Sequence, residues 1–163
     1  MGWDSHAAAD GWTAEALVAV ANRDDVLAAQ VPADIAAWCP GYEKATLPER
    51  RAFWVAMMSA VARHESGWNP AAVGGRGRYI GLMQISPRTA SHAGCDAVSA
   101  GALKDGGDNL ACAVEIFAPQ VARDGLVTGP GNRGMGRDWM PFRKAGARAE
   151  MARWVSAQPF CRG

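Results

Sequence analysis

The sequence predicts a mainly α-helical protein that folds as a single domain with little or no β-structure. Several stretches repeat apolar residues at helical spacing behind helix-capping residues, whereas only Tyr79 to Ile85 resembles a strand. At 163 residues the chain has the size of one ordinary domain. Its 49% hydrophobic and 20% charged residues are typical of a globular chain, and no apolar run is long enough to cross a bilayer.

The balance of charge excludes nucleic acid as the expected main ligand. The 17 lysines and arginines nearly match the 16 aspartates and glutamates, which leaves a net charge of +1. A protein that binds nucleic acid through its phosphates usually has a marked excess of positive charge. A neutral or mixed-charge ligand is therefore expected.

The N-terminal part of the chain predicts one helix behind a flexible segment. Residues 1–12 are small and polar, and we expect them to be flexible, with the folded domain spanning residues 13–163. Thr13 is a plausible cap for a single helix that reaches Gln30. The stretch "PADIAAWC" predicts a short helical turn, and Pro40 to Pro48 is a turn-rich linker.

The strongest local signal predicts a helix from Leu47 to Glu65. Thr46 and Glu49 have the spacing of a capping box, and Gly67 is placed to end the helix. One face of this helix carries apolar residues three and four positions apart, namely Trp54, Met57, Met58 and Val61.

The second half of the chain predicts shorter helices separated by glycine-rich loops. The stretch from Ala71 to Gly81 contains four glycines and predicts an irregular segment or a short hairpin. Capping residues and apolar spacing predict helices over Ser86 to Gly94 and over Asp108 to Ala122. A second glycine-rich loop runs from Asp124 to Trp139, and "ARAEMARWVSA" predicts a final helix.

The four cysteines indicate disulfides and not a metal site. They form no CxxC pair and have no histidine at zinc-ligand spacing. Of the three possible pairings we favour Cys95 with Cys112 and Cys39 with Cys161, which predicts an oxidising compartment and a periplasmic or secreted protein. The first residues, "MGWDSHAAADGW", show no signal peptide. The alternative is four buried free thiols in a cytosolic protein.

Glu65 is the residue whose position points most clearly to chemistry. It follows Val61 by four residues, so its side chain continues the apolar face and is expected to be partly desolvated. Burial and the negative end of the helix dipole both raise the pKa of a carboxyl group. A carboxylic acid that keeps its proton near neutral pH is what a general acid in glycoside cleavage needs. The alternative is a surface residue, or one that pairs with an arginine such as Arg63.

Two blocks of sequence resemble the signature of the soluble lytic transglycosylases, which are relatives of goose-type lysozyme. They are "ESGWNP" and, after a glycine-rich gap, "GLMQISPRTA". The resemblance covers about Val61 to Phe117, where "DNLACAVEIF" is similar to a further family helix and places Asn109 on its motif asparagine. It implies a lysozyme-like fold and non-hydrolytic cleavage of the β-1,4 bond between N-acetylmuramic acid and N-acetylglucosamine in peptidoglycan, with a 1,6-anhydro product.

The same resemblance implies roles for individual residues. Glu65 would be the single acid and base, and Met83 and Gln84 would line the saccharide cleft. The N-acetyl oxygen of the substrate would stabilise the reacting carbon, so no cofactor and no metal are expected. Ser66 would orient the acid or cap the helix, and Asn109 would bind the substrate or the loop backbone.

The chain departs from the family pattern at two places. Family members usually have a serine in the loop between the blocks, where this chain has Gly74 and a second glycine. The family's later Ala-Tyr-Asn-Ala-Gly block is absent, and Tyr79 is one candidate substitute. The other is the stretch "RDWMPFR", in which Trp139 and Phe142 would offer stacking faces for sugars and Arg143 a donor to a carboxylate.

Three functions are consistent with the sequence. The first is a monomeric lytic transglycosylase that opens the wall for a secretion or conjugation machine or for a phage-like particle, in which case it is virion-associated. The second is a hydrolytic lysozyme that uses a second carboxylate, Asp138 or Asp96. The third is a cell-wall-binding protein of the same fold without activity.

Overall fold

The computed structural model describes all 163 residues and is mainly helical. It contains one two-stranded sheet and five α-helices, which confirms the predicted fold class. The helices are α1 (Ala9–Ala21), α2 (Leu47–Ser66), α3 (Pro87–Ala93), α4 (Gly106–Asp124) and α5 (Ala145–Ser156). The strands are β1 (Val73–Gly74) and β2 (Tyr79–Ile80), and short 3-10 turns connect several of these elements. None of the helices combines the length and the hydrophobicity that crossing a membrane requires.

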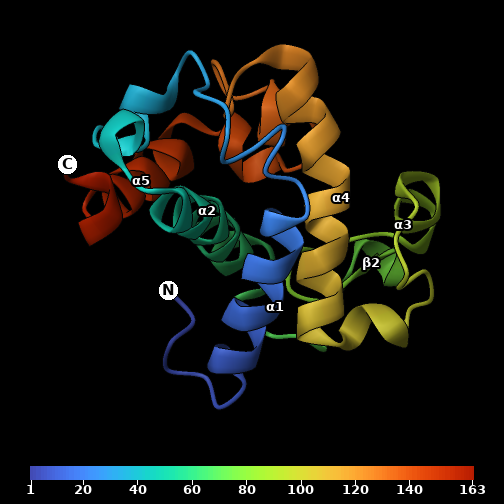
Figure 1. Ribbon diagram of the computed structural model, residues 1–163. Coiled ribbons are helices and arrows are strands. Elements are labelled where there is room, and N and C mark those ends of the chain that lie inside the picture. Colours follow the sequence, from blue (N-terminus) through green and yellow to red (C-terminus); the bar gives the residue numbers. More distant parts are fainter.

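Helices α1, α4 and α5 pack around α2, which lies in the core of the domain, and α3 packs against α4. In Figure 1, α1 and α4 lie side by side, α3 and the β-hairpin lie beyond α4, and α5 with the C-terminus lies on the opposite side of the molecule. Every residue of α2 from Phe53 to Ala62 is buried. The last turn of α2 therefore emerges from the core, and it carries Glu65.

The local signals that predict α2 act as expected. The backbone N–H of Thr46 donates to Glu49 Oε2 at 2.7 Å, and the backbone N–H of Glu49 donates to Thr46 Oγ1 at 3.4 Å. This capping box satisfies two N–H groups that a helix start leaves without partners. Gly67, with φ 61°, ends the helix in the left-handed conformation that glycine adopts without strain. The helix ends at Ser66, one residue beyond the predicted end.

The N-terminal prediction differs from the structure. Helix α1 begins at Ala9, four residues before Thr13, and Trp3, Ala9 and Trp12 of the segment expected to be flexible are buried. Trp3 is fully buried, its ring stands edge-on to Trp12 at 6.0 Å, and its Nε1 donates to Thr13 Oγ1 at 2.9 Å. Two indole rings supply enough apolar area to hold an otherwise small and polar segment in place.

The single helix predicted to reach Gln30 ends instead at Ala21. The polar residues that follow turn towards neighbouring helices: Asp24 forms an ion pair with Arg51 of α2, and Arg23 Nη2 donates to Glu115 of α4 at 3.0 Å. These partners are far apart in the sequence, so apolar spacing alone could not indicate where the helix ends.

The remaining elements follow the predictions closely. The glycine-rich stretch forms the hairpin, in which Val73 pairs with Ile80 and Gly74 pairs with Tyr79. Helix α3 is capped by Ser86, whose hydroxyl accepts from the N–H of Thr89 at 3.1 Å. Helices α4 and α5 each begin two residues earlier than predicted.

Both predicted disulfides are present, Cys39–Cys161 and Cys95–Cys112. The first joins the linker before α2 to the C-terminus across 122 residues, and the second spans 17 residues and joins the segment after α3 to α4. No free cysteine remains.

The two disulfides are expected to stabilise the fold to different degrees. Because loop-closure entropy grows with loop length, removing Cys39–Cys161 by double serine substitution should lower the free energy of unfolding by about 5 kcal/mol, and removing Cys95–Cys112 by about 3 kcal/mol. Urea unfolding of both double variants, followed by circular dichroism, measures the difference. A larger loss from the short loop would contradict this order.

Candidate active site

Glu65 occupies the last turn of α2 and is half-buried. Burial raises the pKa of its carboxyl group to about 7, while the positive charge of Lys144 acts in the opposite direction. This is the direction that its position on the apolar face predicts. Near neutral pH the group exists in both forms, so it can give a proton and take one back.

The neighbouring charges on α2 do not neutralise Glu65. Arg63 Nη1 donates to Glu150 Oε1 of α5 at 3.1 Å, and His64 Nε2 lies 3.9 Å from the same oxygen. The pairing of Glu65 with Arg63 that the sequence left open is therefore not formed. No side chain or backbone group donates a hydrogen bond to the Glu65 carboxyl, which leaves its oxygens free for a ligand.

Ser66 fastens the end of α2 to the loop that carries the second sequence block. Its hydroxyl lies 2.8 Å from the carbonyl oxygen of Leu82 and 3.1 Å from that of Ala62, and it donates to these acceptors. It makes no hydrogen bond with Glu65. Of the two roles considered for Ser66, the contacts are those of a residue that closes the helix end.

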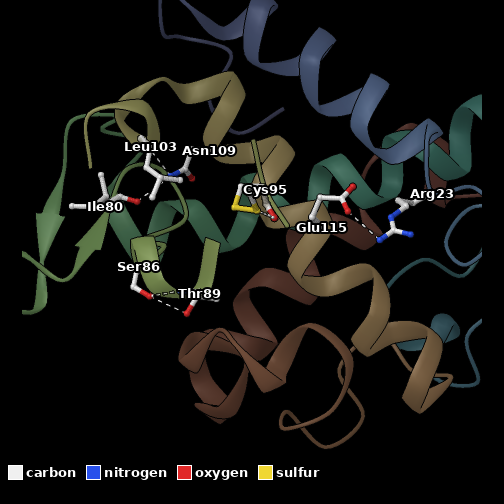
Figure 2. The surroundings of a disulfide bond; sticks show 9 residues. Arg23, Ile80, Ser86, Thr89, Cys95, Leu103, Asn109 and Glu115 are labelled. Atoms are coloured by element: carbon white, nitrogen blue, oxygen red, sulfur yellow. Dashed lines mark hydrogen bonds and ion pairs between the residues drawn. A yellow bond between two sulfur atoms is a disulfide. The ribbon is translucent and has the colours of Figure 1, made fainter. Parts of the chain in front are cut away.

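Asn109 of α4 fixes the backbone of that loop, and Figure 2 shows its side chain beside Ile80 and Leu103. Its side chain is fully buried, and its Oδ1 accepts from the backbone N–H of Met83 at 2.9 Å. Its Nδ2 donates to the carbonyl oxygens of Ile80 and Leu103, both at 3.0 Å. Gly81 (φ 79°) passes so close that a Cβ there would collide with Leu103 and Asn109. Asn109 therefore binds loop backbone, the second of the two roles considered for it.

The structure corrects the cleft roles expected for two apolar side chains. The side chain of Met83 is fully buried, and Trp139 is only 3% exposed. Trp139 Nε1 donates to the carbonyl oxygen of Met83 at 2.8 Å, so the indole supports the loop from the core side. Trp139 lines a small pocket together with Tyr79 and Gln84, but an indole that is 3% exposed offers no open face to a sugar. The backbone N–H of Met83 donates to Asn109 and its carbonyl oxygen accepts from Trp139, so both backbone groups of Met83 already have partners inside the protein.

The other residues of "RDWMPFR" are also used inside the protein. Phe142 is buried and stands edge-on to Trp38 at 5.8 Å. Arg143 Nε donates to the carbonyl oxygen of Gly136 at 2.9 Å and its Nη2 to that of Arg137 at 2.8 Å. This stretch is therefore a structural support of the loop and does not provide the stacking faces that its aromatic content suggested.

Gln84 and Tyr79 do face a small pocket of about 70 Å³. Tyr79 is 41% exposed, and Gln84 Nε2 donates to the carbonyl oxygens of Ala72 at 3.2 Å and Gly81 at 3.1 Å. A Cβ at Gly74 would collide with Gln84 Oε1. The side chain of Gln84 thus fills the space where a residue larger than glycine would stand.

Asp138 brings a second carboxyl group to the same pocket. Although much of the residue is exposed, partial desolvation raises the pKa of the carboxyl, and a hydrogen bond from Gln120 Nε2 at 3.5 Å acts against this. Asp138 is one of the two carboxylates that the sequence offered for a hydrolytic reaction, and it lines this pocket beside Tyr79 and Gln84.

Lys144 is the site residue that sequence reasoning missed. It is exposed and directly precedes α5, and its charge acts on Glu65 although the two residues are 79 positions apart by number. No local motif surrounds it, so only the packing of α5 against α2 brings the two charges near each other.

A group of three carboxylates lies elsewhere, on the surface between α1 and the start of α4. Ligand atoms of Glu15, Asp105 and Asp108 lie within 4.8 Å of one another. Partial desolvation and repulsion by the two aspartates raise the pKa of Glu15. All three side chains are exposed, and Glu65 is not part of this group.

Comparisons with known proteins agree with the fold. The family model described as "Transglycosylase SLT domain" matches residues 46–151. No curated protein matches the chain. Among solved structures, wild-type Bd0314 DslA is similar, with a TM-score of 0.85 and 25% identity over 97% of this chain and 94% of that chain. A DslA variant with a glutamate replaced by glutamine gives a TM-score of 0.84 and 25% identity over 98% of this chain and 96% of that chain.

Proposed function

Because the chain belongs to the transglycosylase SLT domain family, we propose that it is a peptidoglycan lytic transglycosylase in which Glu65 is the acid and the base. The observation that carries this proposal is a half-buried carboxyl at the end of α2, with a pKa of about 7 and no hydrogen-bond donor from the protein. A group in this state is suited to two successive proton transfers at neutral pH.

In the proposed reaction the protonated Glu65 gives its proton to the glycosidic oxygen between N-acetylmuramic acid and N-acetylglucosamine. The bond from that oxygen to C1 of the muramic acid breaks, and the N-acetyl oxygen of the same sugar stabilises the electron-poor C1. The Glu65 carboxylate then takes the proton of the C6 hydroxyl, whose oxygen bonds to C1. The products are a 1,6-anhydro sugar and a free N-acetylglucosamine end, and no water, metal or cofactor takes part.

The surrounding residues divide into ligand contacts and supports. We assign Gln84 and Tyr79 to substrate binding, because both line the pocket beside the loop. Ser66, Asn109 and Trp139 hold the loop in place through their contacts with Leu82, Met83 and Ile80. Buried hydrogen bonds of this kind fix a loop more firmly than exposed ones do.

A hydrolytic lysozyme is the second candidate, and the place of Asp138 in the pocket is the observation that favours it. A hydrolase needs a water molecule at C1 and usually a second carboxylate to activate or replace it. The lytic mechanism needs neither, so Asp138 would then be dispensable for bond cleavage.

Replacing Asp138 with asparagine is expected to change the rate of glycan cleavage less than about threefold, because a lytic mechanism has no step for this carboxylate. Digestion of purified sacculi in ¹⁸O-labelled water provides the matching readout. Wild type and the Asp138→Asn variant should both yield products without ¹⁸O. Labelled reducing ends, together with a loss of about a hundredfold or more in the variant, would establish the lysozyme reaction. Absence of any cleavage by wild type would indicate the binding protein.

The two disulfides and the family indicate a location outside the cytoplasm, where peptidoglycan lies. We place the protein in the periplasm or among secreted proteins, acting as a monomer. We further propose that the enzyme opens the wall locally for a secretion or conjugation machine or for a phage-like particle. In the last case the protein is part of a virion.

A further inference from the structure

A second cavity, which we call the accessory pocket, lies between the end of α2 and the middle of α5. Two half-buried indole rings line it, those of Trp68 just after α2 and Trp154 on α5. Glu65 does not line it. The lining residues of α2 recur at helical spacing and form one stripe, namely Ser59, Ala60, Arg63 and His64. The accessory pocket is therefore separate from the site of the proposed acid.

Trp68 is a fixed wall of the accessory pocket. Its φ of 61° lies in the left-handed region, which a bulky side chain adopts only where the surrounding structure enforces it. Its Nε1 donates to the carbonyl oxygen of Ser59 at 2.9 Å, and the His6 ring stands edge-on to it at 6.1 Å. A Cβ at Gly2 would collide with the indole. The ring is thus held in position without a ligand.

Trp154 retains a free hydrogen-bond donor. Its Nε1 is not buried and donates no hydrogen bond within the protein. The side-chain hydrogen bond at this residue is the one that its carbonyl oxygen accepts from Gln158 Nε2 at 2.9 Å, on the backbone side. The indole therefore offers both an apolar surface and an N–H group to a ligand.

The rim of the accessory pocket carries paired charges with unused hydrogen-bonding groups. Arg63 Nη1 donates to Glu150 Oε1 at 3.1 Å, and His64 Nε2 lies 3.9 Å from the same oxygen. Glu150 Oε2 and Arg63 Nη2 make no hydrogen bond in the protein, and the two side chains are 45% and 63% exposed. The rim thus presents an acceptor and donors, while the opposite charges offset each other.

This combination of groups suits an uncharged, N-acetylated sugar. The C–H faces of a sugar can lie on indole rings, and its hydroxyl and amide groups can bond with polar side chains at the rim. The cavity has a volume of about 50 Å³. One water molecule needs about 10–15 Å³ by this measure, so an acetamido group fits inside, whereas a sugar ring has to lie across the rim. A carboxylate of a stem peptide would instead meet the carboxylate of Glu150.

We propose that the accessory pocket is a second glycan-binding site, which takes the acetamido group of a sugar in the peptidoglycan strand and holds its ring against Trp154 and Trp68. The choice of ligand rests on the proposed function. His64 directly precedes Glu65 and Trp68 follows it by three residues, so the pocket and the acid belong to the same end of α2. A polymer that occupies two weak sites at once binds more tightly than it binds either site alone.

Indole N–H signals in ¹H–¹⁵N NMR spectra test this site directly. The probe is chitotetraose, a neutral chain of N-acetylglucosamine, added to the Glu65→Gln protein so that it is not cleaved. Trp68 and Trp154 report on the accessory pocket, and Trp139 reports separately on the pocket beside Gln84. We expect the signals of Trp68 and Trp154 to move with one common dissociation constant.

Substitutions on both sides of the accessory pocket identify the groups that bind. Trp154→Leu keeps an apolar side chain without an aromatic face, so it should weaken the binding seen at Trp68 by about fivefold, and Trp154→Phe should retain most of it. Glu150→Gln, at the exposed rim, leaves the core untouched and should weaken binding by about threefold. Phe160→Leu is the matched control, because Phe160 is half-buried near the C-terminus and does not line the pocket. None of these changes should alter the response of Trp139.

Three results would overturn the proposal. They are movement of the Trp139 signal alone, a loss of binding in Trp154→Leu no larger than in Phe160→Leu, and movement of Trp68 and Trp154 with a stem peptide but not with chitotetraose. Binding is measured here without bond cleavage, so it is independent of the proposed reaction. A sacculus digest by wild type that contains no anhydro ends would contradict the proposed function and leave the binding result unchanged.

Discussion

Replacing Glu65 with glutamine is expected to slow glycan cleavage by about 10³-fold to 10⁴-fold, because one side chain supplies both proton transfers. Glutamine keeps the shape and the burial of the side chain but neither gives nor takes a proton at this pH. Release of soluble fragments from purified sacculi measures the rate. Glu43→Gln, at an exposed glutamate on a 3-10 turn, is the matched control and should retain full activity.

The same substitution should make the folded domain more stable above neutral pH. The pKa of Glu65 rises on folding from an ordinary 4.5 to about 7. A carboxyl with a raised pKa binds its proton more tightly in the folded state, so the domain loses stability as pH increases from about 4.5 through 7. The total loss is about 3 kcal/mol, which Glu65→Gln should remove. Equal unfolding free energies for the two proteins in urea at pH 8 would show that the carboxyl is not desolvated.

Replacing Asn109 with leucine is expected to destabilise the domain by on the order of 6 kcal/mol and to abolish activity at the same time. The change leaves the N–H of Met83 and the carbonyl oxygens of Ile80 and Leu103 buried without partners. Each such group costs about 2 kcal/mol, and all three belong to the loop beside Glu65 or to its support. Thermal and urea unfolding measure the loss.

Two further variants separate the effect of losing the Asn109 hydrogen bonds from the effect of any substitution at the start of α4. Asp108→Asn, at the exposed position next to it, should change stability by less than about 0.5 kcal/mol. Asn109→Asp keeps the acceptor for Met83 but places a charged carboxylate against two carbonyl oxygens, so it should be more stable at acidic pH, where the carboxyl is protonated and can donate. A loss below about 1 kcal/mol for Asn109→Leu would contradict the structural role.

The features that sequence predicted well are those that local chemistry decides. The capping box at Thr46 and the glycine at position 67 delimit α2, and a carboxyl on the apolar face of that helix has to be partly buried. The favoured one of the three possible cysteine pairings is also the one formed, with Cys95–Cys112 as a local pair and Cys39–Cys161 holding the C-terminus.

The features that sequence missed depend on contacts between distant segments. Trp139 and Phe142 carry the aromatic rings expected of a sugar platform, yet packing beneath the loop buries both. Trp3 likewise converts a polar N-terminal segment into part of the core. The influence of Lys144 on Glu65 arises only when α5 packs on α2. Composition shows which side chains are available but not which face of the fold they occupy.

The measurement that tests the central claim most directly is mass spectrometry of the muropeptides released from purified sacculi by wild type and by Glu65→Gln. The account predicts 1,6-anhydromuramyl ends in the wild-type digest and none in the digest of the variant. Reducing ends in the wild-type digest, or anhydro ends that persist in the variant, would contradict the assignment of Glu65 as the acid and base of a lytic transglycosylase.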